Sequence, residues 1–183
     1  MKRPHGVWKA QRVFTESSSA AMALEYSLPT THKASERLLI GRHEWIGLQE
    51  FGSQPWVAKT DSGARTSTLH ATDITVSADG QTVRFTTTCS DQSTLVCETP
   101  IVRCKIIRSS AGIAEQRVII ATTAIFAGGL SFPIELTLAD RSNMKCPVLL
   151  GRRAMAGYFL IDPQSDYLLG NQNDFFQTAL HSS

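Results

Sequence analysis

Asp61-Ser62-Gly63-Ala64 is the segment of this chain whose residue types could do chemistry. Asp and Ser side chains bond back to their own backbone and Gly tolerates positive φ, so these residues predict a tight turn. Two carboxylates held a few ångströms apart can share one proton, so that one acts as a base and the other as an acid. Because the chain carries one such Asp turn, this chemistry would need a second copy of the chain. An ordinary surface turn is the alternative.

The residues on either side of this turn indicate the elements that would hold it. Residues 56–60, directly before Asp61, predict a buried strand, and residues 148–150 form a second short apolar run that stops at Gly151. We expect Gly151 to permit close packing beneath the Asp turn. We expect Arg152 to brace the turn through hydrogen bonds.

From Arg37 onward the pattern is β, because short runs of β-branched and apolar residues are separated by turn signals. The Asp-Gly pair within residues 78–81 predicts a hairpin turn, and residues 152–156 favour one short helix that Gly157 ends. Short strands at this spacing predict a closed β barrel, and the absence of an internal repeat excludes a fused two-lobed enzyme. The predicted strands are residues 38–40, 44–48, 56–60, 67–71, 74–76, 82–87, 101–107, 116–122, 134–138, 148–150 and 158–161.

Length and composition predict one folded domain with two tails. A chain of 183 residues with 42% hydrophobic content can bury one core without splitting into two domains. A net charge of +2 gives no electrostatic case for nucleic acid, and no apolar run approaches the roughly 20 residues of a membrane span. The N-terminus lacks the apolar segment of a secretory signal, so we expect a cytoplasmic protein. We expect a flexible extension over residues 1–36, a β domain over 37–171 and a tail over 172–183.

The cysteines and histidines show no metal-ligand spacing. Neither Cys-x-x-Cys nor His-Glu-x-x-His occurs, and Cys89, Cys97, Cys104 and Cys146 are far apart along the chain. We expect reduced, buried thiols in β strands. We expect His70 to be a hydrogen-bonded strand residue, with a place in the site as the alternative. No phosphate-binding Gly-Lys-Ser/Thr loop occurs, so we expect neither a metal nor a cofactor.

The ordered series of motifs resembles a bacterial family of retropepsin-like aspartic peptidases, often labelled putative ATP-dependent zinc proteases. Ser62 stands where the family more often has Thr, which keeps the hydroxyl group. Arg65 stands where viral retropepsins usually carry an acid that pairs with the Arg of the Gly-Arg segment. Arg152 therefore needs another acceptor, for which Asp140, Asp162 or a backbone carbonyl would serve. The resemblance covers roughly residues 38–170 and is carried by residues 40–48, 58–71, 108–112, 136–144, 151–152 and 159–163.

The resemblance implies an aspartic-type endopeptidase that works as a homodimer on a peptide or protein substrate. Asp61 of each subunit would lie on either side of one water molecule, and Ser62 would form a hydrogen bond across the dimer. Gly63 and Ala64 would leave room for an extended substrate. Family members often occur beside ATP-grasp ligases that add glutamate to peptides, which suggests a substrate context.

Retropepsin-like dimers cover their substrate with mobile β hairpins, and the resemblance implies such a flap here. The candidate flap is Ser109, Ser110, Ala111 and Gly112, with residues 127–130 as a competing candidate that looks more like a plain tight turn. Two other functions stay open at this point: a non-catalytic peptide-binding dimer, and the zinc-dependent peptidase that the family label suggests.

Overall fold

The computed structural model describes residues 37–52, 54–108 and 114–174. The predicted extension over residues 1–36 lies outside the described residues, as do residues 175–183 of the predicted tail. The elements are β1 (Leu38–Ile40), β2 (His43–Leu48), η2 (Gln49–Phe51), β3 (Trp56–Asp61), β4 (Ser67–His70), β5 (Thr72–Val76), β6 (Thr82–Thr88), β7 (Thr94–Pro100), β8 (Arg103–Arg108), β9 (Ala114–Phe126), β10 (Ser131–Ala139), β11 (Val148–Gly151), α1 (Arg152–Met155) and β12 (Phe159–Ile161).

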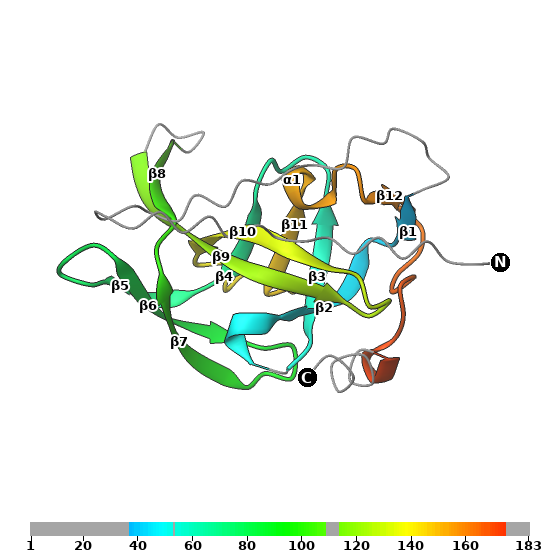
Figure 1. Ribbon diagram of the computed structural model, residues 1–183, viewed down its shortest axis with the longest axis horizontal. Helices are drawn as coiled ribbons and strands as arrows, with labels where there is room; N and C mark the ends of the chain where they lie inside the picture. Colours follow the sequence, from blue (N-terminus) through cyan, green and yellow to red (C-terminus); the bar gives the residue numbers. More distant parts are fainter. Residues whose placement is uncertain (1–36, 53, 109–113, 175–183) are drawn as a thin grey trace, which may run out of the picture.

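Six of the described strands close into a barrel in the order β10-β4-β11-β3-β2-β9, and β9 pairs again with β10. The β10–β4 and β11–β3 pairs are parallel, and the other neighbours in the ring are antiparallel. Closure leaves no free edge within the ring. Figure 1 shows these strands gathered at the centre of the molecule. The all-β fold with a closed barrel, predicted from the sequence, is confirmed.

The long strand β9 belongs to the barrel and also pairs with β8, the strand before it in the chain. Its first half pairs with β8, from Arg108 opposite Ala114 to Arg103 opposite Ile119, and its second half pairs with β10. Two smaller sheets complete the described fold: β5-β6-β7, and the parallel pair β1-β12. No described helix is long and apolar enough to span a membrane.

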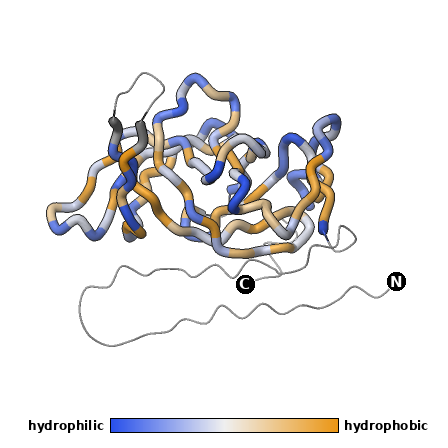
Figure 2. The backbone as a smooth tube through the Cα atoms, turned by 90° about the horizontal axis from the view of Figure 1, so that it is seen from above, coloured by the Kyte–Doolittle hydropathy of each residue, from blue (hydrophilic) through white to orange (hydrophobic). Residues whose placement is uncertain are grey.

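The core fills the barrel and continues under the three-stranded sheet. Trp56 and Phe126, on strands of the barrel, are fully buried, and so is Phe85 on β6. The ring of Phe51 meets that of Phe85 edge-on with 5.8 Å between centroids, which ties the small sheet to the barrel. Figure 2 shows hydrophobic residues recurring along the strands and hydrophilic residues at many of the turns. Within β6 burial alternates from one residue to the next, as the two-residue period of a strand requires.

Several details differ from the predicted elements. β7 has no counterpart among the predicted strands, because its buried positions hold Cys97 and Thr99 rather than large apolar residues. β9 is longer at both ends than predicted, since it pairs with three different strands. All four cysteines are free, and Cys89 and Cys97 are buried as expected. Cys104 is exposed on β8 and Cys146 is partly buried in the loop before β11, so these two do not fit the prediction of buried thiols.

Candidate active site

Asp61 ends β3 at the point where the chain leaves the barrel. Along β3 the side chains of Trp56 and Ala58 are fully buried, whereas Lys59 is exposed and Asp61 is partly buried. The Asp61 carboxylate turns back onto its own loop: Oδ1 accepts hydrogen bonds from the amide of Gly63 at 2.8 Å and from that of Ala64 at 3.1 Å. Its other oxygen, Oδ2, accepts no hydrogen bond from the described part of the chain. One oxygen is thus fixed in place and the other is available to a water or a second carboxylate.

The loop after Asp61 presents small groups to solvent. Ser62 and Gly63 are exposed and Ala64 is partly buried. The Ser62 hydroxyl has no hydrogen-bond partner among the described residues. A Cβ atom added to Gly63 would lie 3.1 Å from Asp61 Oδ1, closer than an ordinary contact. A larger residue at that position would therefore crowd the carboxylate.

Gly151 lies directly beneath this loop. It pairs with Asp61 in the parallel register of β11 and β3, and its amide donates to Ser67 Oγ at 3.1 Å. A Cβ atom at Gly151 would lie 2.5 Å from the carbonyl carbon of Thr66 and 2.6 Å from its oxygen. Only a glycine allows β11 to approach the end of the Asp61 loop this closely.

Arg152 begins α1 and binds the same loop. Its Nη1 donates to the carbonyl oxygen of Ser62 at 2.7 Å and to that of Gly63 at 2.9 Å. The backbone amide of Arg152 donates to the carbonyl of Ala64 at 2.9 Å, which satisfies one of the free amides at a helix N-terminus. The acceptors of Arg152 are therefore backbone carbonyls, rather than Asp140 or Asp162.

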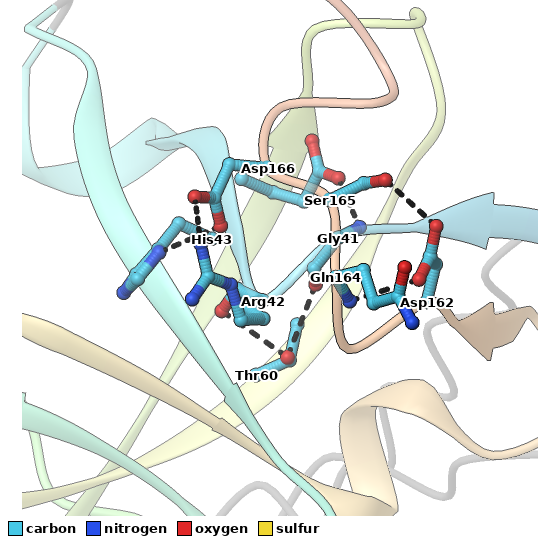
Figure 3. Close-up of polar contacts among 9 residues, drawn as sticks. Gly41, Arg42, His43, Thr60, Asp162, Gln164, Ser165 and Asp166 are labelled. Carbon is cyan, nitrogen blue, oxygen red and sulfur yellow. Dashed lines mark hydrogen bonds and ion pairs between the residues drawn. The ribbon is translucent and has the colours of Figure 1, made fainter.

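The strand that carries Asp61 is anchored on the turn between β1 and β2. Thr60 donates through Oγ1 to the carbonyl of Gly41 at 3.1 Å, and its amide donates to the carbonyl of Arg42 at 2.9 Å. Figure 3 shows Arg42 and His43 both turned toward Asp166, at 2.6 and 2.9 Å respectively. The hydrogen bonds from Arg42 and His43 lower the pKa of Asp166, so this carboxylate stays charged and holds the C-terminal segment against β2.

Glu44 is a buried carboxylate that was not among the site residues predicted from the sequence. It is fully buried, and it accepts hydrogen bonds from the amides of Gly41 at 2.7 Å, Leu168 at 3.0 Å and Leu169 at 3.2 Å. Burial raises its pKa, although the three amides oppose the shift. The available signal was its strand position, because Glu44 shares the inward face of β2 with Ile46 and Leu48.

His70 ends β4 and is hydrogen-bonded, as predicted. Its Nδ1 accepts the amide hydrogen of Arg141 at 3.0 Å, and its backbone amide donates to the carbonyl of Pro147 at 2.7 Å. These two bonds hold the start and the end of the loop between β10 and β11.

The candidate flap, Ser109, Ser110, Ala111 and Gly112, lies outside the described residues, although the paired strands β8 and β9 on either side of it are described. The competing segment 127–130 forms a tight turn, in which the amide of Gly129 donates to Phe126 at 2.9 Å and that of Phe126 donates to Leu130 at 2.8 Å. Among the described residues, no group of three or more His, Cys, Asp or Glu side chains could hold a metal ion.

Comparison with known proteins gives relatives over most of the chain. A probable alpha-L-glutamate ligase of Shewanella halifaxensis is 36% identical over 150 residues, which cover 77% of this chain and 32% of the ligase. A probable alpha-L-glutamate ligase of Desulfotalea psychrophila is 38% identical over 137 residues, which cover 72% of this chain and 29% of the ligase. The chain thus spans about a third of the length of these curated relatives.

The fold also matches a solved structure. A Legionella pneumophila protein of unknown function (DUF785) superposes with a TM-score of 0.58 at 25% identity, over 72% of this chain and 97% of that chain. Residues 39–172 match the family described as RimB-like, the retropepsin-like aspartic endopeptidase RimB. This match spans the whole barrel and includes Asp61, Gly151 and Arg152. The chain therefore belongs to the RimB-like family of retropepsin-like aspartic endopeptidases.

Proposed function

We propose that this chain is an aspartic-type endopeptidase that works as a homodimer, with Asp61 of each subunit as the catalytic residue. The observation that carries the proposal is the orientation of Asp61. Its Oδ1 is held by the amides of Gly63 and Ala64, and its Oδ2 is left without a partner among the described residues. A carboxylate fixed in this way needs no reorganisation before it acts.

In the proposed reaction one water lies between Asp61 and the partner subunit's Asp61. The ionised carboxylate takes a proton from the water as its oxygen attacks the carbonyl carbon of the substrate, and the protonated carboxyl donates its proton to the carbonyl oxygen. As the C–N bond of the tetrahedral intermediate breaks, the carboxyl that took the water's proton gives it to the leaving nitrogen, and the other carboxylate takes a hydroxyl proton from the intermediate, which restores one shared proton. The two carboxyl groups titrate as one unit.

The assembly is proposed from the single Asp turn, and the exposed apolar residues of the β1–β12 sheet support it. Leu38, Leu39 and Leu160 are 44%, 51% and 38% exposed, although they lie on a regular two-stranded sheet. In Figure 1 this sheet, α1 and the end of β3 lie on the same upper side of the molecule. A second copy is proposed to cover Leu39 and Leu160, which are register partners and lie on the same face of this sheet.

The substrate is proposed to bind as an extended strand, because backbone pairing gives affinity and side-chain pockets give selection. The chemical class of the substrate is proposed from the relatives, which are named probable alpha-L-glutamate ligases. Peptides that carry added glutamate residues are therefore the first substrates to try.

The test is Asp61→Asn, which keeps the size of the side chain but removes its ionisation. Wild-type and variant proteins are incubated with a peptide library that includes glutamate-rich members, and the products are identified by mass spectrometry. Cleavage should fall by several orders of magnitude, because both the base and the acid of the pair are lost. Asp91→Asn is the matched control, since Asp91 also caps a turn, where its Oδ1 accepts from Ser93.

A thermal melt shows whether each variant is folded. Equal cleavage by wild type and Asp61→Asn would exclude the aspartic mechanism. No cleavage by folded wild-type protein would favour a peptide-binding dimer. Cleavage that a chelator abolishes would favour the zinc-dependent alternative.

A further inference from the structure

A basic cavity of about 250 Å³ opens beside the strand that carries Asp61. Its lining includes His43 from β2, Lys59 from β3, and Arg141, Lys145 and Cys146 from the loop between β10 and β11. Pockets for drug-sized molecules usually measure roughly 300–1,000 Å³. This smaller cavity matches one side chain of a peptide better than a whole ligand.

The register of β3 fixes where this cavity lies relative to Asp61. Lys59 and Asp61 are two residues apart on one strand, so their side chains leave the same face, opposite the buried Ala58. Two residues of strand span about 6.6 Å. His43 lies directly across from Lys59 in β2, and Gly151 lies beside Asp61 in β11. An extended peptide whose scissile bond is at Asp61 would place a side chain one or two residues away at the cavity.

The positive charges around the cavity are not neutralised by the described chain. Lys59, Arg141 and Lys145 form no ion pair with any described residue, and the buried Nε of Arg141 has no hydrogen-bond partner there. Asp166 is the acid whose charge acts on Cys146 in the cavity wall, and it is already bound by Arg42 and His43.

Lys59, Arg141 and Lys145 line one cavity together with the thiol of Cys146. Burial is the largest influence on the pKa of Cys146 and raises it, whereas the charges of Lys59, Arg141 and Lys145 each lower it. The charge of Asp166 also raises this pKa, so cations from two separate segments and one acid all act on this thiol.

The loop that supplies Arg141 and Lys145 is held in position. His70 Nδ1 binds the amide of Arg141 at 3.0 Å, and the amide of Met144 donates to the carbonyl of Arg141 at 2.7 Å. The cations are thus presented by fixed backbone, so little ordering is needed when an anion binds.

We propose that this cavity is a specificity subsite that binds a carboxylate side chain of the substrate, within two residues of the scissile bond, through Lys59, Arg141 and Lys145. The role of this subsite in selecting the bond that is cleaved rests on the proposed function, but its capacity to bind a carboxylate does not. Lys59 and Arg141 are specificity-determining residues in this proposal and take no part in the chemistry.

Binding is measured separately from cleavage. A fluorescent hexaglutamate peptide and its hexaglutamine counterpart are titrated against the Asp61→Asn protein. We expect hexaglutamate to bind at least tenfold more tightly, and Lys59→Gln or Arg141→Gln to weaken it roughly fivefold or more, because each removes a charge-assisted contact. Arg84→Gln removes an exposed cation on β6, away from the cavity, and should leave binding unchanged. A thermal melt controls for folding.

Equal binding of the two peptides, or equal losses for Arg84→Gln and Lys59→Gln, would overturn the subsite. A second arm uses wild-type protein and glutamine peptides in which one glutamate is moved along the sequence. Cleavage should be favoured when that glutamate lies within two residues of the cut, and no positional preference would overturn the proposal. Selective binding without any cleavage would leave the subsite in place and reject the peptidase function.

Discussion

Gly151→Ala tests the close approach between β11 and the Asp61 loop. The new Cβ would lie 2.5 Å from the carbonyl carbon of Thr66, whereas carbon atoms pack at about 3.5–4.0 Å, so the loop must retreat by about 1 Å. Overpacking of this kind costs about 1–3 kcal/mol. The hydrogen bond from the Gly151 amide to Ser67 Oγ adds about 1 kcal/mol if it is lost.

The free energy of unfolding should therefore fall by about 2–4 kcal/mol, which corresponds to a drop in Tm of roughly 5–15 °C for a chain of this size. Under the proposed function, cleavage by the folded variant should fall about 100-fold, because Asp61 pairs with Gly151 and a 1 Å displacement disturbs the reacting geometry. The assays are a thermal melt and peptide cleavage below the melting transition.

Gly128→Ala is the matched control. A Cβ at Gly128 would lie 3.6 Å from the carbonyl oxygen of Leu169, which is ordinary contact, so its Tm should change little. If Gly151→Ala melts within a degree or so of wild type, the close packing beneath the Asp61 loop is not as described and the argument for Gly151 fails.

Three further predictions concern the carboxylates Glu44 and Glu135 and the effect of chelators. Glu44→Gln should lower the free energy of unfolding by about 1–3 kcal/mol, because the new amide group would face the N–H of Leu169; an unchanged urea midpoint would contradict this. Glu135 has a pKa lowered by its hydrogen bonds from Arg103, so its contribution to stability is present above the ordinary value of 4.5 and is lost as the pH falls through the lower folded pKa. Melts of wild type and Glu135→Gln should therefore converge only in acid. Chelators should change neither melting nor cleavage, and one zinc per chain lost together with activity would reverse that expectation.

The barrel could be predicted from the sequence because its strands are marked locally. The apolar runs at residues 56–60 and 148–150 end at Asp61 and Gly151, and the structure pairs these two strands in parallel with those residues adjacent. The Asp-Gly hairpin turn within residues 78–81 also needs only local chemistry, and Gly80 has a φ of +72°.

Features built from distant segments could not be predicted in the same way. The acceptors of Arg152 depend on where the Ser62 and Gly63 carbonyls point after the loop has folded. The basic cavity joins β2, β3 and the loop before β11, so no sequence window contains more than part of it. The burial of Glu44, in contrast, could have been predicted from the sequence, because Glu44 alternates with Ile46 and Leu48 on the inward face of β2.

The measurement that tests the central claim most directly is activity in mixed dimers. Wild-type and Asp61→Asn chains are unfolded together, refolded in equal amounts and assayed for peptide cleavage, with light scattering to establish the assembly. If two Asp61 carboxylates form one catalytic pair, only dimers with two wild-type chains are active, and activity should be about one quarter of that of the same total amount of wild type. Activity of about one half would mean that each chain works alone, and would contradict the shared pair.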